Sequence, residues 1–303
     1  MKTNLLNSLM YAVVIVLSEG LSLNSALAQN ATDTKLATIW YSEQFIFHSK
    51  SLERDFLIQV AKPLKPQTAK LPVIYLVDGN SLFPEVATTI QGLGAFGGSA
   101  PAYVVGIGYP DQTLEQWGTL RTHDLLFGSV PESVKLVPDS FKAAAASGNG
   151  AGFASFVLQE LRPEIERRYP VDRQQSILAG HSLGASFAAH VLLLHDSGTF
   201  DSYLLCSPSI WTEPQLLDKA SRFHSANPLK VFIGVGTKED EKFVEGHMVP
   251  NARELVSRLR NHASAVDISL VEFEGKNHGS AIPDCINQGL GALLPVPPTA
   301  LGH

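Results

Sequence analysis

The sequence predicts an α/β fold, in which a mainly parallel sheet carries helices on both faces. Two observations predict it. Short, continuously apolar runs such as Val73–Val77 and Tyr103–Ile107 recur along the chain, as expected of strands covered on both faces. Stretches with apolar residues at three-to-four spacing fall between the later runs, and this alternation is typical of parallel sheets. We expect one domain over about residues 33–292, followed by a C-terminal tail at 293–303.

The sheet is expected to open with an antiparallel hairpin. Thr38–Phe47 and Asp55–Ala61 are both strand-like, and a short segment with turn-forming residues separates them. Four further apolar runs indicate the later strands. They are Ser176–Ala179, Tyr203–Cys206, Val231–Val235 and Ile268–Phe273. Together with the two earlier runs, they supply the parallel part of the sheet.

Helices are predicted between these strands, with one interruption. Residues 153–168 and 251–263 repeat apolar side chains at helical spacing, and Pro163 predicts a kink in the first of them. Residues 109–150 break the alternation and run into the small-residue segment Ala143–Gly152, which we expect to be a mobile surface loop. Such a loop either borders a ligand site at the carboxyl ends of the strands or is a tolerated insertion.

The composition is that of a globular protein whose acidic charge balance disfavours polyanionic partners. The chain of 303 residues is 45% apolar and 17% charged, which is enough apolar material for a substantial core. The net charge is −6 and no run of basic residues occurs. This balance argues against nucleic acid and against an anionic membrane surface as partners.

Residues 1–28 have the pattern of a secretory signal peptide. Lys2 precedes an apolar run at 12–17, and the small residues Ala26-Leu27-Ala28 fit a cleavage site. The alternative is an uncleaved membrane anchor, but Glu19 interrupts the apolar stretch and the run is shorter than a bilayer requires. No later segment is apolar enough to insert stably into a membrane. We therefore expect a periplasmic or secreted protein.

The segment Gly180–Gly184 gives the sharpest chemical signal. Its pattern G-x-S-x-G follows a strand-like run and precedes Ala185–Leu194, which is compatible with a helix. Strand, tight turn and helix form the nucleophile elbow of α/β hydrolases. The turn strains the backbone of the serine, so the residues beside it must be small. The sequence therefore predicts the α/β-hydrolase fold, with Ser182 as nucleophile.

A serine nucleophile needs a base, and the base needs an orienting carboxylate. His278 is the best-placed base, because it follows the last predicted strand and this fold has the chain order Ser, acid, His. The acid should follow Val231–Val235, where Glu239, Asp240 and Glu241 compete. The histidines show no metal-ligand spacing, so we expect neither a metal nor an organic cofactor.

Two backbone N–H groups are expected to form an oxyanion hole. The first belongs to Leu183, the residue after the nucleophile. The second should come from Asp78–Ser81, after an early strand, and Asn80 is favoured there. Asp78-Gly79 could equally be an ordinary tight turn.

Most of the chain after the signal resembles an esterase family of α/β hydrolases. That family includes siderophore esterases of the ferric-enterobactin type, esterase D and the mycolyltransferases. The resemblance rests on six segments that occur in the same order, namely Ile74–Asn80, Val104–Tyr109, Arg121–Leu125, Gly180–Gly184, Ser207–Trp211 and Asn277–Pro283. It implies that Ser182 and His278 work as a pair, and the siderophore esterases of the periplasm look most similar.

The same resemblance implies further site residues. It favours Glu239 as the acid, with Asp240 second, and it suggests that Arg121 and Trp211 line the substrate pocket. An arginine can hold an anionic oxygen bidentately, and a tryptophan offers an aromatic wall. The alternatives are a salt bridge from Arg121 to Asp124 and plain core packing for Trp211.

These residues predict a serine esterase that hydrolyses a small-molecule carboxylic ester through an acyl-enzyme. The resemblance implies that a siderophore trilactone is an example of such an ester. An acyltransferase would use the same residues, and a non-catalytic exported binding protein on this scaffold is the alternative from another class. Export also permits a disulfide between Cys206 and Cys285, although two buried thiols fit the sequence equally. The sequence leaves the oligomeric state open.

Overall fold

The structure is a computed structural model that describes residues 38–65, 67–110, 112–135, 137–194, 199–225, 227–263 and 265–296. The described residues from Ile39 onward form one compact unit. The predicted signal peptide at 1–28 and the tail beyond residue 296 lie outside the described residues. The domain boundaries given above therefore stay predictions.

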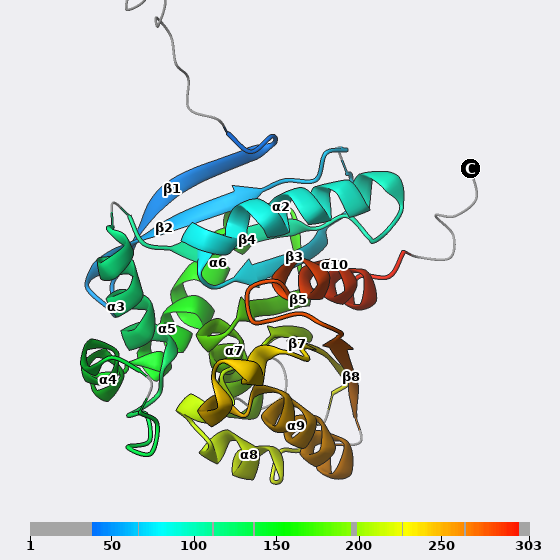
Figure 1. Ribbon diagram of the computed structural model, residues 1–303. Helices are drawn as coiled ribbons and strands as arrows, with labels where there is room; N and C mark the ends of the chain where they lie inside the picture. Colours follow the sequence, from blue (N-terminus) through cyan, green and yellow to red (C-terminus); the bar gives the residue numbers. More distant parts are fainter. Residues whose placement is uncertain are drawn as a thin grey trace, which may run out of the picture. The chain divides into compact units, whose positions relative to one another are not determined.

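An eight-stranded sheet in the order β1-β2-β4-β3-β5-β6-β7-β8 is the centre of the described part (Figure 1). The strands are β1 Ser42–Ser49, β2 Arg54–Ala61, β3 Leu71–Leu76, β4 Tyr103–Gly108, β5 Val171–His181, β6 Ser202–Cys206, β7 Leu229–Gly236 and β8 Val266–Phe273. β2 pairs antiparallel with both β1 and β4, and all the other pairings are parallel. The predicted α/β-hydrolase type of fold, with its N-terminal hairpin, is confirmed.

The sheet is covered by helices on both faces. The helical segments are α2 Gly79–Phe96, α3 Leu114–Leu125, α4 Asp139–Ala146, α5 Gly150–Phe156, η1 Val157–Leu161, α6 Arg162–Arg168, α7 Leu183–Leu194, η2 Ile210–Thr212, α8 Gln215–Ala220, η3 Glu239–Glu241, η4 Val244–Gly246, α9 Met248–His262 and α10 Ile282–Leu293. None of them, within the described ranges, combines the length and apolar character that a membrane crossing requires.

The two faces have separate cores. α2 and α10 lie side by side over one face, where Phe83 and Leu290 pack with Ile74 of β3 (Figure 1). α5, α7 and α9 contribute to the larger core on the other face, where Phe187 packs with Tyr75. Alternate side chains of one strand therefore enter different cores, which explains the continuously apolar runs in the sequence.

The expected surface loop over residues 109–150 is wrong, because this stretch contains α3 and α4. α3 begins with a capping box, in which Thr113 accepts the N–H of Gln116 and the Gln116 side chain accepts the N–H of Thr113. α4 ends in a run of alanines, the residues with the highest helix propensity. The small residues therefore form a short helix, of which Ala144 and Ala145 are buried, rather than a mobile segment.

The helix predicted over 153–168 exists and is interrupted, as Pro163 suggested. α5 continues into the π-helical turn η1, and α6 then begins with Pro163 in its first turn. Proline has no N–H to donate to the preceding turn, so the helix must change its hydrogen bonding there.

The two cysteines form a disulfide. Cys206 is the last residue of β6, and Cys285 lies in the first turn of α10. Of the two possibilities that the sequence left open, the structure therefore shows the paired one. The bond links the carboxyl end of β6 to α10, the helix that follows β8 in the chain.

Candidate active site

Ser182 lies at a sharp turn between β5 and α7. Its backbone has φ +59°, in the left-handed region that few residues other than glycine adopt. Its N–H donates to the carbonyl of Cys206 at 2.9 Å, which fixes the turn to β6. A Cβ on Gly180 would come within 2.3 Å of the backbone of Gly184, so these positions require glycine. This arrangement is the strand–turn–helix geometry of a nucleophile elbow.

His278 and Glu239 form a hydrogen-bonded pair beside this turn. Nδ1 of His278, in the turn after β8, is 2.6 Å from Oε2 of Glu239. The other carboxylate oxygen accepts the hydroxyl of Ser207 at 2.6 Å and the N–H of Gly236 at 2.7 Å. Burial opposes ionisation of Glu239, but these three hydrogen bonds outweigh it and lower its pKa. An ionised Glu239 therefore orients the imidazole.

The three competing carboxylates have different positions. Glu239 is buried and contacts His278, whereas Asp240 accepts the N–H groups of Met248 at 2.6 Å and Val249 at 3.2 Å. Asp240 therefore stabilises the start of α9. Glu241 lines the cavity described below. The geometry thus gives the role of orienting carboxylate to Glu239.

Ser182, His278 and Glu239 line one cavity, but the serine is not hydrogen-bonded to the histidine. Among the described residues, the contact of Ser182 Oγ is with Oγ of Ser209, at 3.1 Å. Bonds between nucleophile and base are often long in enzymes without substrate and tighten when substrate binds. The acid–base half of the site is therefore already assembled, and the nucleophile faces the same space.

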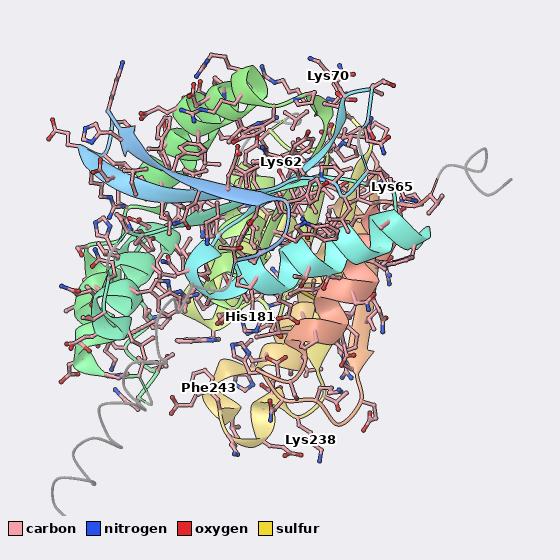
Figure 2. The ribbon with its side chains drawn as sticks, turned by 90° about the horizontal axis from the view of Figure 1, so that it is seen from above. Lys62, Lys65, Lys70, His181, Lys238 and Phe243 are labelled. Carbon is pink, nitrogen blue, oxygen red and sulfur yellow. A yellow bond between two sulfur atoms is a disulfide. The ribbon has the colours of Figure 1, made fainter. Side chains whose placement is uncertain are left out.

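The cavity has a volume of about 330 Å³ and an aromatic wall. Its lining consists of Ser182, Ser209, Trp211, Lys238, Glu239, Glu241, Lys242, Phe243, Met248, Asn277 and His278. The rings of Trp211 and Phe243 meet edge to face with centroids 4.9 Å apart, and Phe141 of α4 stacks on Trp211. Figure 2 shows Lys238 and Phe243 on the same side of the molecule as His181, away from Lys62, Lys65 and Lys70.

The stretch 109–150 therefore borders the site, because α4 carries Phe141. Trp211 lies in the cavity wall as the resemblance implied, rather than only in the core.

Two cations also line the cavity. Lys238 and Lys242 take part in no ion pair within the described part of the chain, so their charge is available to a ligand.

The two expected oxyanion donors lie at helix starts. Leu183 is the first residue of α7, where N–H groups have no acceptor within the helix. The side chain of Asn80 is engaged elsewhere, because it donates to the carbonyl of Tyr109 at 2.8 Å and accepts the N–H of Tyr109 at 2.7 Å. Asn80 is not among the residues that line the cavity, and it can contribute only its backbone N–H.

The structure corrects the expectation for Arg121. Its guanidinium donates through Nε and Nη2 to the two carboxylate oxygens of Asp78, at 2.7 and 2.6 Å. Arg121 is not among the residues that line the cavity. The alternative partner, Asp124, instead accepts from Arg54 and from the hydroxyl of Tyr109. α3 brings the guanidinium of Arg121 to the turn between β3 and α2, where it meets the carboxylate of Asp78.

Sequence reasoning missed the part that Asp78 plays in this region. Asp78 has φ +60° and is the N-cap residue of α2, two residues after β3 ends. A Cβ on Gly184 would lie 3.1 Å from Oδ2 of Asp78, so the carboxylate sits directly behind the elbow. Arg121 neutralises this charge, which would otherwise oppose a developing oxyanion. The sequence pattern marks Asp78–Ser81 as an oxyanion loop or a tight turn, and neither interpretation predicts the ion pair between Asp78 and Arg121.

His181 supports the loop that carries the base. Its Nε2 donates to the carbonyl of His278 at 3.0 Å, and the two rings lie 4.5 Å apart. Burial and the neighbouring charge of His278 lower the pKa of His181 to about 4. The side chain is therefore a neutral donor near pH 7, and it holds the backbone of the turn that carries the base.

Comparisons with known proteins agree with this geometry. Residues 49–279 match the model of a family described as "Putative esterase". The ferri-bacillibactin esterase BesA of Bacillus subtilis is 33% identical over 276 residues, covering 88% of this chain and 93% of BesA. The siderophore triacetylfusarinine C esterase of Aspergillus fumigatus is 29% identical over 283 residues, covering 82% of this chain and 91% of that protein.

Solved structures show the same likeness. The BES protein from Bacillus cereus superimposes with a TM-score of 0.74 at 30% identity, over 87% of this chain and 99% of that one. The family match spans most of the chain, and the fold and site geometry are those of an α/β hydrolase. The chain therefore belongs to this esterase family and is an ester hydrolase.

Proposed function

We propose that the protein is an exported serine esterase that cleaves a siderophore-type ester through an acyl-enzyme on Ser182. The observation that carries this proposal is one shared cavity. It brings a strained serine at an elbow together with a histidine whose Nδ1 is 2.6 Å from a buried carboxylate. A serine, a base and an orienting carboxylate are the groups that nucleophilic acyl transfer needs.

The mechanism follows from these positions. His278 takes the proton of Ser182 as Oγ attacks the ester carbonyl, and Glu239 stabilises the imidazolium through Nδ1. The N–H of Leu183, with the backbone N–H of Asn80, is proposed to stabilise the oxyanion. His278 then gives its proton to the leaving alkoxide, and the acyl group remains on Ser182. Water, activated by His278, releases the acid and restores the hydroxyl.

Two observations support a siderophore as the substrate class. The related enzymes from Bacillus subtilis and Aspergillus fumigatus are named for siderophore esters, and they match over most of their length. The cavity itself combines an aromatic wall of Trp211 and Phe243 with Lys238 and Lys242, two cations that form no ion pair with any residue that the structure describes. Such a lining suits an ester with aromatic or anionic groups.

Export to the periplasm or to the medium is part of the proposal. It is supported by the signal-like pattern at residues 1–28 and by the disulfide between Cys206 and Cys285. Disulfides persist in oxidising compartments and are rare in the cytosol. Fractionation of cells that express the full chain, with mass analysis of its N-terminus, tests this part.

Product analysis with a cyclic trilactone tests the proposed activity. The wild-type protein should open the trilactone to its linear ester and then to monomers, and it should also hydrolyse p-nitrophenyl acetate. Ser182→Ala should lose both activities while keeping its melting temperature. Equal turnover of either ester by the variant would contradict the serine mechanism. Turnover of p-nitrophenyl acetate without any action on the trilactone would contradict the substrate class.

A further inference from the structure

A second serine hydroxyl lies against the nucleophile. Oγ of Ser209 is 3.1 Å from Oγ of Ser182, and both residues line the cavity. Ser209 is only 2% exposed. Within the described ranges, neither hydroxyl makes a hydrogen bond to any other group. The two hydroxyls therefore form an isolated pair inside the site.

The position of Ser209 does not depend on this contact. Its N–H donates to the carbonyl of Ser182 at 3.2 Å, and its own carbonyl accepts the hydroxyl of Thr212 at 2.8 Å. The parallel register that pairs His181 with Cys206 also brings the segment after β6 beside the elbow. Backbone contacts thus hold the Ser209 hydroxyl next to the reacting oxygen, which is how a preorganised catalytic group is built.

We propose that Ser209 is a further catalytic residue, whose hydroxyl donates a hydrogen bond to Ser182 Oγ while the acyl-enzyme is hydrolysed. This inference rests on the proposed acyl-enzyme. Ser182 gives up its own proton in the first step, so it can no longer donate to Ser209. The hydrogen bond must then run from Ser209 to Ser182 Oγ, which has become the ester oxygen of the intermediate.

The hydrogen bond from Ser209 to Ser182 Oγ should accelerate deacylation more than acylation. In deacylation, water loses a proton to His278 and adds to the acyl carbon. The bond between that carbon and Ser182 Oγ then breaks, its electron pair moves onto Oγ, and the proton on His278 goes to the same oxygen. Donation from Ser209 stabilises the negative charge that grows on Oγ. In acylation the same donation occupies a lone pair of the attacking oxygen, so acylation gains little.

Pre-steady-state hydrolysis of p-nitrophenyl acetate by Ser209→Ala tests the inference. We expect kcat to fall on the order of tenfold, as for one lost hydrogen bond, with KM falling in parallel. The ratio kcat/KM should stay within about threefold, because it reports acylation. The burst of p-nitrophenolate should approach one equivalent per protein molecule, and intact-mass analysis should show acetylated enzyme accumulating.

Matched variants separate catalysis from structure. Ser209→Thr keeps a hydroxyl and should recover the wild-type burst and kcat. Ser207→Ala removes the neighbouring hydroxyl that binds Glu239, and it should lower kcat/KM without accumulating acyl-enzyme. If Ser209→Ala does not fold, as judged by its melting curve, Ser209→Cys has a similar shape and only a weak donor. It should then show the same accumulation.

Two results would overturn the inference. Wild-type kinetics in Ser209→Ala would show that the contact has no part in turnover. A fall in kcat/KM without accumulation would place any role of Ser209 in binding or acylation. Neither outcome touches the proposed function, which fails instead if Ser182→Ala remains active.

Discussion

Glu239 is the residue whose position the structure separates most clearly from those of its neighbours. It is one of three neighbouring carboxylates, and spacing alone could not choose among them. Its buried oxygens accept from His278, Ser207 and the N–H of Gly236, whereas Asp240 accepts from the start of α9. The choice therefore depends on which side chain the turn after β7 directs inward, and this is a tertiary property.

Exchanging these carboxylates one at a time gives a matched test. Glu239→Gln should lower kcat by between about a hundredfold and ten-thousandfold, because the amide cannot stabilise the imidazolium. Asp240→Asn should keep its activity within about threefold and lose about 0.5–1 kcal/mol of stability, since the start of α9 loses a favourable negative charge. Kinetics and urea unfolding measure the two effects. The reverse pattern would assign the acid to Asp240.

His181 makes stability depend on pH. Its pKa in the folded protein is lowered to about 4 from an ordinary value of 6.5. Between these values the unfolded chain binds a proton at His181 that the folded protein does not, so stability falls as the pH drops from 6.5 to 4. The full effect is about 3 kcal/mol. In His181→Gln, whose amide can still donate to His278, urea unfolding should show a shallower decline over this window. Identical slopes in both proteins would contradict the lowered pKa.

At the scale of elements, strands were easier to predict than helices. Each inner strand is covered on both faces, so a continuous apolar run in the sequence indicates its position. α4 carries no such signal, because it is short, rich in alanine and has no side-chain cap at its start. Its stability comes from packing, including the contact of Phe141 with Trp211, and packing partners distant in sequence are not visible in a local pattern.

The contact between α4 and the cavity wall has a kinetic consequence. Phe141→Ala should remove the ring that stacks on Trp211, with centroids 6.1 Å apart, and leave the indole less well ordered. We expect KM for an aromatic ester to rise about twofold to tenfold, the range for one lost aromatic pair, with kcat nearly unchanged. Ser140→Ala, at an exposed neighbouring position, is the control. A loss confined to kcat would mean that α4 acts on the reacting groups instead.

Arg121 shows another limit of local reasoning. The sequence offers Asp124, only three residues later, as a nearby partner for the guanidinium. The actual partner, Asp78, is distant in sequence and meets Arg121 only because the fold brings α3 to the turn between β3 and α2. Ser209 reaches Ser182 in the same way, through the pairing of β5 with β6. Motifs predicted which residues matter, but the contacts between motifs needed the fold.

For the whole molecule, the disulfide is the strongest single constraint. It joins Cys206 and Cys285 across 79 residues, a span that includes the turns that carry Ser209, Glu239 and His278. In the chain-entropy account, closing a loop of this length stabilises the fold by about 4.5 kcal/mol. Cys206→Ala with Cys285→Ala should lower the free energy of unfolding by about this amount, measured in urea. An unchanged midpoint would show that packing of α10 alone holds this region.

The central claim is that Ser182 carries the covalent intermediate, and labelling with a fluorophosphonate tests it most directly. We expect one equivalent of the reagent to be incorporated, peptide mapping to place it on Ser182, and esterase activity to disappear in proportion. Glu239→Gln should be labelled much more slowly, because His278 would be a weaker base. Labelling at another residue, or full activity in protein labelled at Ser182, would contradict the mechanism.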